Sequence, residues 1–303
     1  MDAGYEALDA SQKLDKLWKS IQGSIYPAGT ALPTQEPGAA EQLGLVWPPH
    51  LKPSFLHCSD ILPAGRSKLI HTFGSVAKVT LQIDSASRYT GVFKSGGIGL
   101  LRISAAKQAF GSFQPGAGLK ILIDKCPSVN FVVMPSLDGQ GNDMNAFKNS
   151  YTNVLAPPKN AALKVVAVAF ECAVSGLSSN PAERPKDARH LPMLEAAQVL
   201  SNGAPVPDAD VRAPHQILFE PTPEITESYK AWMDEDVRLG LAQIPAGTVL
   251  FHVKARASAA ADAELIGSLV TESQFVASEF GDRALFFQHM RHRSADGAPG
   301  VAA

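Results

Sequence analysis

His71 has the side chain best suited to acid–base chemistry in this sequence. It lies in KLIHTFGSVAKVTLQID, residues 68–84, where apolar and polar side chains alternate. A period of two is typical of a half-buried strand, and it puts His71 on the apolar, inward face. Burying an imidazole costs free energy unless a hydrogen bond or a ligand compensates. The position therefore predicts either a structural histidine, bonded to a backbone carbonyl or to Ser104, or a histidine that lines a pocket and transfers protons.

The composition excludes several classes of function. The 303 residues are 45% hydrophobic with a formal net charge of -2, which supports a substantial core but no general attraction for phosphate. No Lys/Arg cluster with interleaved aromatic residues occurs, so we expect no nucleic-acid partner. The first residues are charged, and no apolar run approaches the roughly 18 residues of a membrane span. The 3 cysteines are widely spaced, as in reduced thiols. We therefore expect a cytoplasmic protein with no membrane span.

The pattern of the chain predicts three parts. Residues 1–62 are expected to form a helix, over about 11–21, followed by an extended arm rich in Pro and Gly. Residues 63–293 form the main domain, with a helical insertion at about 143–205, and residues 294–303 form a disordered tail. Short strands with Gly-rich turns on both sides of the insertion favour an antiparallel sheet or barrel over a doubly wound sheet.

The predicted strands fall in two blocks. The first block comprises residues 68–84, 89–94, 98–104, 117–124 and 128–134, and the second comprises HQILFEP, GTVLFHVKA, ELIGSLVTES and RALFFQHMR. Within the insertion, residues 145–174 and the segment LPMLEAAQVL have helical character. One long helix is expected over Pro223–Ile244. The fold class is thus α+β, with about eight strands.

The order of several motifs resembles a known family. The segments KLIHTFGSVAKV, GLLRISAA, PGAGLKILID and SVNFVVM follow one another as do the barrel motifs of the heme-catalase-like superfamily, which includes catalases and allene oxide synthases. LAQIPAGTVLFHV and LIGSLVTESQF also resemble its closing strands. The resemblance covers about residues 63–293, and it implies a catalase-like antiparallel β-barrel with an N-terminal arm.

The resemblance also implies a set of site residues. His71 matches the distal histidine that acts on a bound peroxide, so it would be catalytic. Asn130 matches the distal asparagine and would orient the peroxide, although a shifted alignment puts Cys126 at that place. The cofactor-binding residues implied are Lys68, Arg102 and Ser104. Arg102 could pair with a ligand anion or, as structure, with a buried carboxylate.

Three features of the sequence depart from the family pattern. Lys68 stands where the family has an arginine that helps to hold a heme propionate, and Pro115 stands where a second arginine is found. Catalase iron is bound by a tyrosinate, on a helix that would begin about where this sequence ends. None of the 5 tyrosines lies in a matching context, so we name no metal ligand. His289, on the last predicted strand, is the alternative axial ligand.

Two functions are consistent with these residues. In the first, the protein binds heme and acts on hydrogen peroxide or on an organic or lipid hydroperoxide, although ordinary catalase activity is not expected. In the second, a heme-free barrel binds a small apolar ligand or another protein. A homo-oligomer is expected by the resemblance in either case.

Overall fold

The structure is a computed structural model, and it describes most of the barrel and its flanking helices. The described residues are 3–33, 60–61, 71–107, 113–125, 128–135, 170–173, 200–201, 204–205, 214, 216–228, 236–257, 260–287, 292–293 and 299–300.

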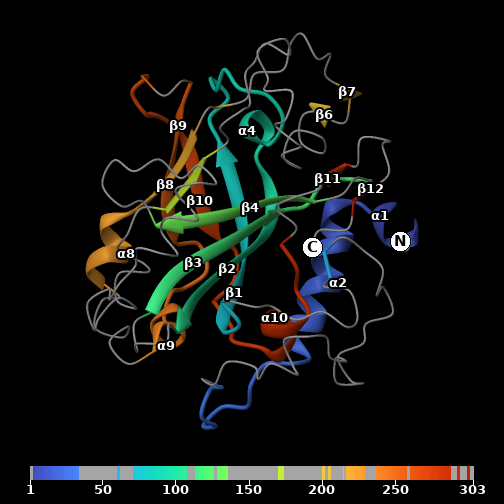
Figure 1. Ribbon diagram of the computed structural model, residues 1–303, viewed down its shortest axis with the longest axis vertical. Coiled ribbons are helices and arrows are strands. Elements are labelled where there is room, and N and C mark those ends of the chain that lie inside the picture. The colour runs from blue at the N-terminus through green and yellow to red at the C-terminus, as the bar shows by residue number, and fades with distance from the viewer. Residues whose placement is uncertain are drawn as a thin grey trace.

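Eight strands form a closed antiparallel barrel (Figure 1). Their hydrogen-bonded order is β1-β10-β9-β8-β5-β4-β3-β2, with β2 paired back to β1. The prediction of an antiparallel, barrel-like sheet is confirmed. The strands are β1 (Gly74–Ile83), β2 (Gly97–Lys107), β3 (Phe113–Ile121), β4 (Val129–Pro135), β5 (Phe170–Ala173), β8 (Gln216–Pro221), β9 (Val249–Arg256) and β10 (Glu264–Thr271).

Short helices and two small ribbons flank the barrel. Figure 1 shows α2 and α10 together on one side of the barrel, and α8 and α9 on the other. The ribbons pair β6 (Leu200–Ser201) with β7 (Ala204–Pro205), and β11 (His292–Arg293) with β12 (Pro299–Gly300). The helices are α1 (Ala3–Glu6), α2 (Ala10–Gln22), α4 (Val92–Ser95), α8 (Pro223–Ser228), α9 (Val237–Leu241) and α10 (Glu279–Arg283).

The alternation of the strands divides the core in two. Inside the barrel, one buried cluster joins alternate apolar residues of the strands, such as Val79, Leu101 and Leu119. A second cluster lies outside the barrel, where Val76 and Leu100 of the sheet meet α2 and α10. Successive side chains of a strand point to opposite faces, so even-numbered residues of β1 to β3 lie on this outer face.

Helix α2 begins and packs as its sequence dictates. The Asp9 carboxylate accepts a hydrogen bond from the Gln12 backbone at 2.8 Å, and the Gln12 side chain accepts one from the Asp9 backbone. This is a capping box, which satisfies two orphan donors of the first turn. Leu17 and Ile21 are fully buried on one face of the helix. The predicted helix over residues 11–21 is confirmed.

The predicted helical character of residues 145–174 is wrong at its end. Phe170–Ala173 is strand β5, which pairs with β4 and β8 and completes the barrel. The run VVAVAFECAV has no alternation, and a short apolar run does not distinguish a helix from a buried strand. The other described residues of the expected helical insertion, in β6 and β7, are also strands.

Three other predicted elements are corrected by local caps. The expected strand over residues 89–94 contains helix α4, which begins after Gly91 at a φ of 61°. The segment RALFFQHMR forms no strand where it is described. Its first residue ends α10, which Ser278 caps by accepting a hydrogen bond from Gly281 at 3.0 Å, and Leu285 pairs only in an isolated bridge with Ile61. The single helix expected over residues 223–244 is instead α8 and α9, and Asp236 caps α9. Within the described part of the chain, no helix is long and apolar enough to cross a membrane.

Candidate functional site

The candidate site lies on the outer face of β1 to β4. The strand register aligns Gly74, Ser104 and Gly116 in one row across the sheet. A second row, four residues further along β3, aligns Lys120 with Asn130. A strand rises about 3.3 Å per residue, so the two rows are about 13 Å apart.

His71 lies on this outer face and not inside the barrel. Strand β1 begins only at Gly74, and the backbone of His71 is left-handed with a φ of 56°. This φ breaks the alternation on which the inward prediction rested. The His71 carbonyl accepts a hydrogen bond from Arg102 Nη1 at 2.8 Å. The imidazole lies over Gly116, where a Cβ would be only 2.8 Å from its Cε1 atom.

The imidazole of His71 is neutral and has no hydrogen-bond partner among the described residues. Its Nδ1 and Nε2 atoms are both buried, and neither bonds to any of those residues. The hydroxyl of Ser104 donates instead to the Gly116 carbonyl at 3.3 Å. Burial and the positive charge of Arg102 lower the pKa of His71 to about 4. The Ser104 backbone lies near enough to the ring to raise this pKa in part, but not in the geometry of a hydrogen bond. Buried polar atoms without partners are rare in proteins and require an explanation.

Arg102 is engaged in a buried ion pair. Its Nη2 atom is 2.8 Å from the Asp282 carboxylate, and the two side chains have exposures of only 5% and 2%. The same carboxylate accepts hydrogen bonds from the Gly74 backbone at 2.9 Å and from the Tyr26 hydroxyl at 3.0 Å. Of the two interpretations of Arg102, this contact corresponds to pairing with a buried carboxylate.

The ring of Phe287 covers the next part of the same face. A Cβ at Gly118 would be 2.8 Å from Phe287 Cγ, so the ring lies directly on the backbone of β3. The Lys120 ammonium is 5.3 Å from the centre of this ring. The preceding residue, Phe286, donates its backbone N–H to the Asp60 carbonyl at 2.9 Å. Phe287 and His71 thus cover positions two residues apart on β3.

A second buried network surrounds Asp60. Its carboxylate accepts hydrogen bonds from Lys120 and from Tyr5, each at 2.6 Å, and from Ser128 at 2.7 Å. Lys120 also donates to the Asn130 side-chain carbonyl at 2.6 Å. Burial by itself would raise the pKa of Asp60, but the charge and hydrogen bond of Lys120, with the bonds from Ser128 and Tyr5, lower it below its usual value.

The structure brings together only some of the site residues that the sequence predicts. His71, Arg102 and Ser104 are neighbours, whereas Asn130 lies in the row of Lys120 and is bonded to that residue. Lys68, Cys126 and His289 lie outside the described residues. Sequence reasoning missed Asp60, Lys120 and Asp282 as site residues. Lys120 lies within the motif PGAGLKILID, but nothing in the sequence marks it, and neither aspartate stands in a motif.

The described residues do not fit a heme bound on this face. The bare backbone at Gly116 and Gly118 is covered by the rings of His71 and Phe287. Arg102 is already paired with Asp282, so it is not available to a propionate.

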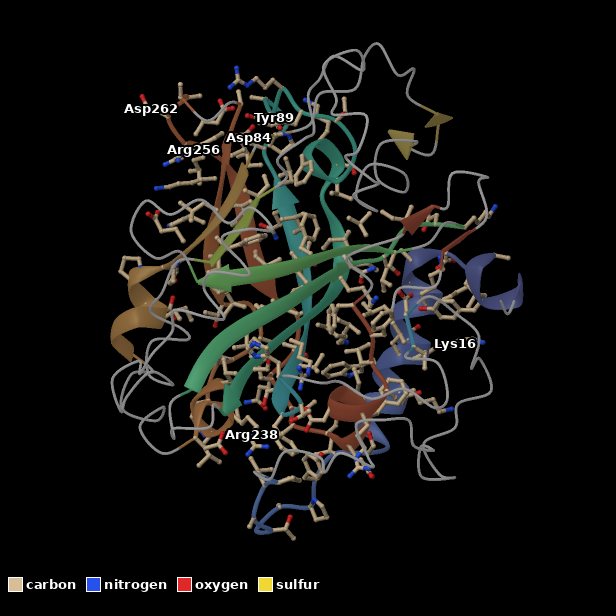
Figure 2. The ribbon with its side chains drawn as sticks, viewed as in Figure 1. Lys16, Asp84, Tyr89, Arg238, Arg256 and Asp262 are labelled. Atoms are coloured by element: carbon tan, nitrogen blue, oxygen red, sulfur yellow. The ribbon has the colours of Figure 1, made fainter. Side chains whose placement is uncertain are left out.

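The described tyrosines do not fit iron ligation either. The hydroxyls of Tyr5, Tyr26 and Tyr89 each donate to a carboxylate. Burial and Asp282 raise the pKa of Tyr26, and burial and Glu264 raise that of Tyr89 to about 12, opposite to what a tyrosinate needs. Figure 2 shows Tyr89 near Asp84, which directly follows the last residue of β1, and Arg238 at the opposite end of the barrel.

Neither metal geometry nor similarity to known proteins identifies the site. In the described ranges, no group of three or more His, Cys, Asp or Glu side chains is arranged to hold a metal ion. No family model, curated protein or solved structure matches this chain in the three comparisons that we made.

Proposed function

We propose that this protein is a catalase-like barrel that binds a small neutral molecule at His71 without heme. The observation that carries the proposal is the buried imidazole whose two nitrogens have no partner among the described residues. The order of the barrel motifs around His71 supports the family.

The chemistry of His71 determines the kind of ligand. A neutral imidazole presents one N–H donor and one acceptor nitrogen. A hydroperoxide or an alcohol presents one O–H donor and oxygen acceptors, so the group can donate to the acceptor nitrogen or accept from the N–H. The nearby charge of Arg102 is balanced by Asp282 at 2.8 Å, which favours a neutral ligand over an anion. We therefore propose hydroperoxides and the corresponding alcohols as the ligand class.

Calorimetric titration with tert-butyl hydroperoxide and with tert-butanol tests the proposal. The wild-type protein is expected to bind at least one of them saturably, and His71→Phe is expected to bind at least about tenfold more weakly, a loss of about 1.4 kcal/mol. Ser273→Ala is the control. Its hydroxyl accepts a hydrogen bond from the Lys78 backbone at 2.9 Å and donates to the Gln274 carbonyl at 3.0 Å, so the substitution removes a bonded hydroxyl that has no contact with His71. Equal affinities in wild type and His71→Phe would refute the assignment of the site.

A heme-dependent hydroperoxide enzyme is the second candidate. It is supported by the convergence of His71, Arg102 and Ser104, which are the matched residues of the family motifs. An absorption titration with hemin separates the two candidates. We expect no saturable Soret band, whereas a band that saturates at one equivalent and changes in His71→Ala would establish the second candidate instead.

A further inference from the structure

The ring of Phe287 lies on bare backbone, and the place that it occupies, called the slot below, has the shape of a flat ring. Its floor is the backbone at Gly118, which has no side chain to hold a ligand away. Lys120 lies at one side, 5.3 Å from the ring centre. A cation near an aromatic face contributes about 0.5–2 kcal/mol that a saturated ring does not receive. The slot therefore favours an aromatic ring over an aliphatic ring of the same size.

The slot lies next to the imidazole of His71. Gly116 and Gly118 are two residues apart on the same face of β3, a separation of about 7 Å. The His71 ring covers the first position and the Phe287 ring covers the second. A molecule that replaced the Phe287 ring would thus place a short substituent within reach of the His71 nitrogens, which have no other described partner.

Several contacts that hold the segment of Phe287 on the barrel do not involve the Phe287 ring. The ring is only partly buried, and the segment is fixed further back, by the bridge between Ile61 and Leu285 and by the bond from Phe286 to Asp60. Asp282 anchors the start of the segment to Arg102. Because none of these contacts is made by the Phe287 ring, displacement of the ring need not break them.

We propose that Phe287 is an internal occupant of the binding site and that the ligand carries an aromatic ring that displaces it, with a hydroxyl or hydroperoxyl group at His71. This inference rests on the proposed function and specifies its ligand class. The ligand-free protein keeps the slot closed with its own side chain, so the affinity measured for a ligand includes the cost of moving Phe287.

The test compares 2-phenylethanol with 2-cyclohexylethanol by calorimetry. Phe287→Ala is expected to bind 2-phenylethanol at least about tenfold more tightly than the wild type does, because the internal competitor is gone. The gain for 2-cyclohexylethanol is expected to be the same, because the cost of moving Phe287 does not depend on the ligand. This ligand is expected to bind both proteins at least about twofold more weakly than 2-phenylethanol does, because it lacks the interaction with Lys120. Phe286→Ala is the matched control, and its affinities are expected to equal those of the wild type.

Two further variants keep the test decisive. If Phe287→Ala does not fold, Phe287→Leu takes its place in the test. It leaves most of the side-chain volume in place, so the expected gain in affinity is smaller. The double variant Phe287→Ala/Gly118→Ala puts a methyl group into the slot. It is expected to lose the gain in affinity for 2-phenylethanol that Phe287→Ala shows. A folded Phe287→Ala or Phe287→Leu variant with wild-type affinity, or an equal gain in Phe286→Ala, would overturn the inference.

The outcome also separates this inference from the proposed function. If removing the Phe287 ring increases affinity for 2-phenylethanol equally in the presence of His71 and in His71→Phe, the slot binds rings but His71 does not bind the hydroxyl, and the proposed function fails. If tert-butyl hydroperoxide binds in a His71-dependent manner and Phe287→Ala gives no aromatic gain, only the inference fails.

Discussion

The Asp60 network and the His71 region lie on the same outer face of the barrel, and each contains a buried ion pair. In the first, Lys120 is 2.6 Å from Asp60, and in the second, Arg102 is 2.8 Å from Asp282. They differ in how far their polar atoms are satisfied. Among the described residues, the buried atoms without partners include both His71 nitrogens and Arg102 Nε, but none from the Asp60 network.

This difference separates a structural network from a binding site. The hydrogen bonds to Asp60 join parts of the chain that are distant in sequence, as from Tyr5 to Asp60 and from Lys120 to Asp60. Such a network fixes the N-terminal segment on the barrel. The unpartnered atoms at His71 contribute no such bond, and they leave donors and acceptors for a ligand.

The largest expected effect is the removal of the Asp60 charge. Asp60→Asn leaves the Lys120 ammonium buried without its counter-ion, which destabilises a protein by about 3–5 kcal/mol. Unfolding by urea measures the change in free energy. Asp60→Asn with Lys120→Met is the control, because it removes both charges, and we expect it to recover part of the loss. A single variant as stable as the wild type would show that the network is not structural.

The next effect is the pH dependence that His71 contributes. Its pKa is about 4 in the folded protein and 6.5 for an unperturbed histidine, so the unfolded chain binds more protons between these values. The contribution of His71 to the free energy of unfolding is fully present above about pH 6.5. It decreases as the pH falls toward and below 4, by about 3 kcal/mol in all. The pKa of Asp60 is lowered, so its contribution decreases only below about pH 4.

Urea unfolding at pH 7 and pH 4.5 measures this dependence for the wild type and for His71→Asn. Asparagine tolerates the left-handed backbone at this position and does not titrate. We expect the variant to lose less stability than the wild type over this interval. Identical losses would mean that His71 is not a buried neutral imidazole.

A smaller effect distinguishes two buried serines of the two regions. Ser128 donates to the Asp60 carboxylate at 2.7 Å, whereas Ser104 donates to a backbone carbonyl at 3.3 Å. A hydrogen bond to a charged group contributes about 1.5–3 kcal/mol, and a neutral one about 0.5–1.5 kcal/mol. Ser128→Ala should therefore lower the thermal midpoint more than Ser104→Ala does. The reverse order would contradict the assignment of the two networks.

The sequence predicts the barrel well where alternation is clear. A period of two predicts the strands correctly in Val76 to Ile83 and in the segments that form β2, β4, β9 and β10. The confirmed helix α2 has a clear apolar face. Periodicity fails for β5, whose apolar run has no alternation, and at His71, where a single left-handed residue moves the side chain to the other face.

The site was less predictable, because its contacts join distant parts of the chain. Arg102 and Asp282 are 180 residues apart, and Tyr5 and Asp60 are 55 apart. No local pattern marks either aspartate. Phe287 was predicted as part of a strand, and its position over Gly118 depends on how Leu285 pairs with Ile61.

The most direct test of the central claim is the nuclear magnetic resonance of the His71 ring nitrogens in ¹⁵N-histidine-labelled protein, assigned with His71→Asn. Spectra are recorded from pH 7 to pH 4 and during titration with tert-butyl hydroperoxide. We predict a neutral imidazole that begins to protonate only near pH 4 and shifts saturably with the ligand. Protonation near pH 6.5, or nitrogens that do not respond to the hydroperoxide, would contradict the claim that His71 is a buried, neutral ligand-binding residue.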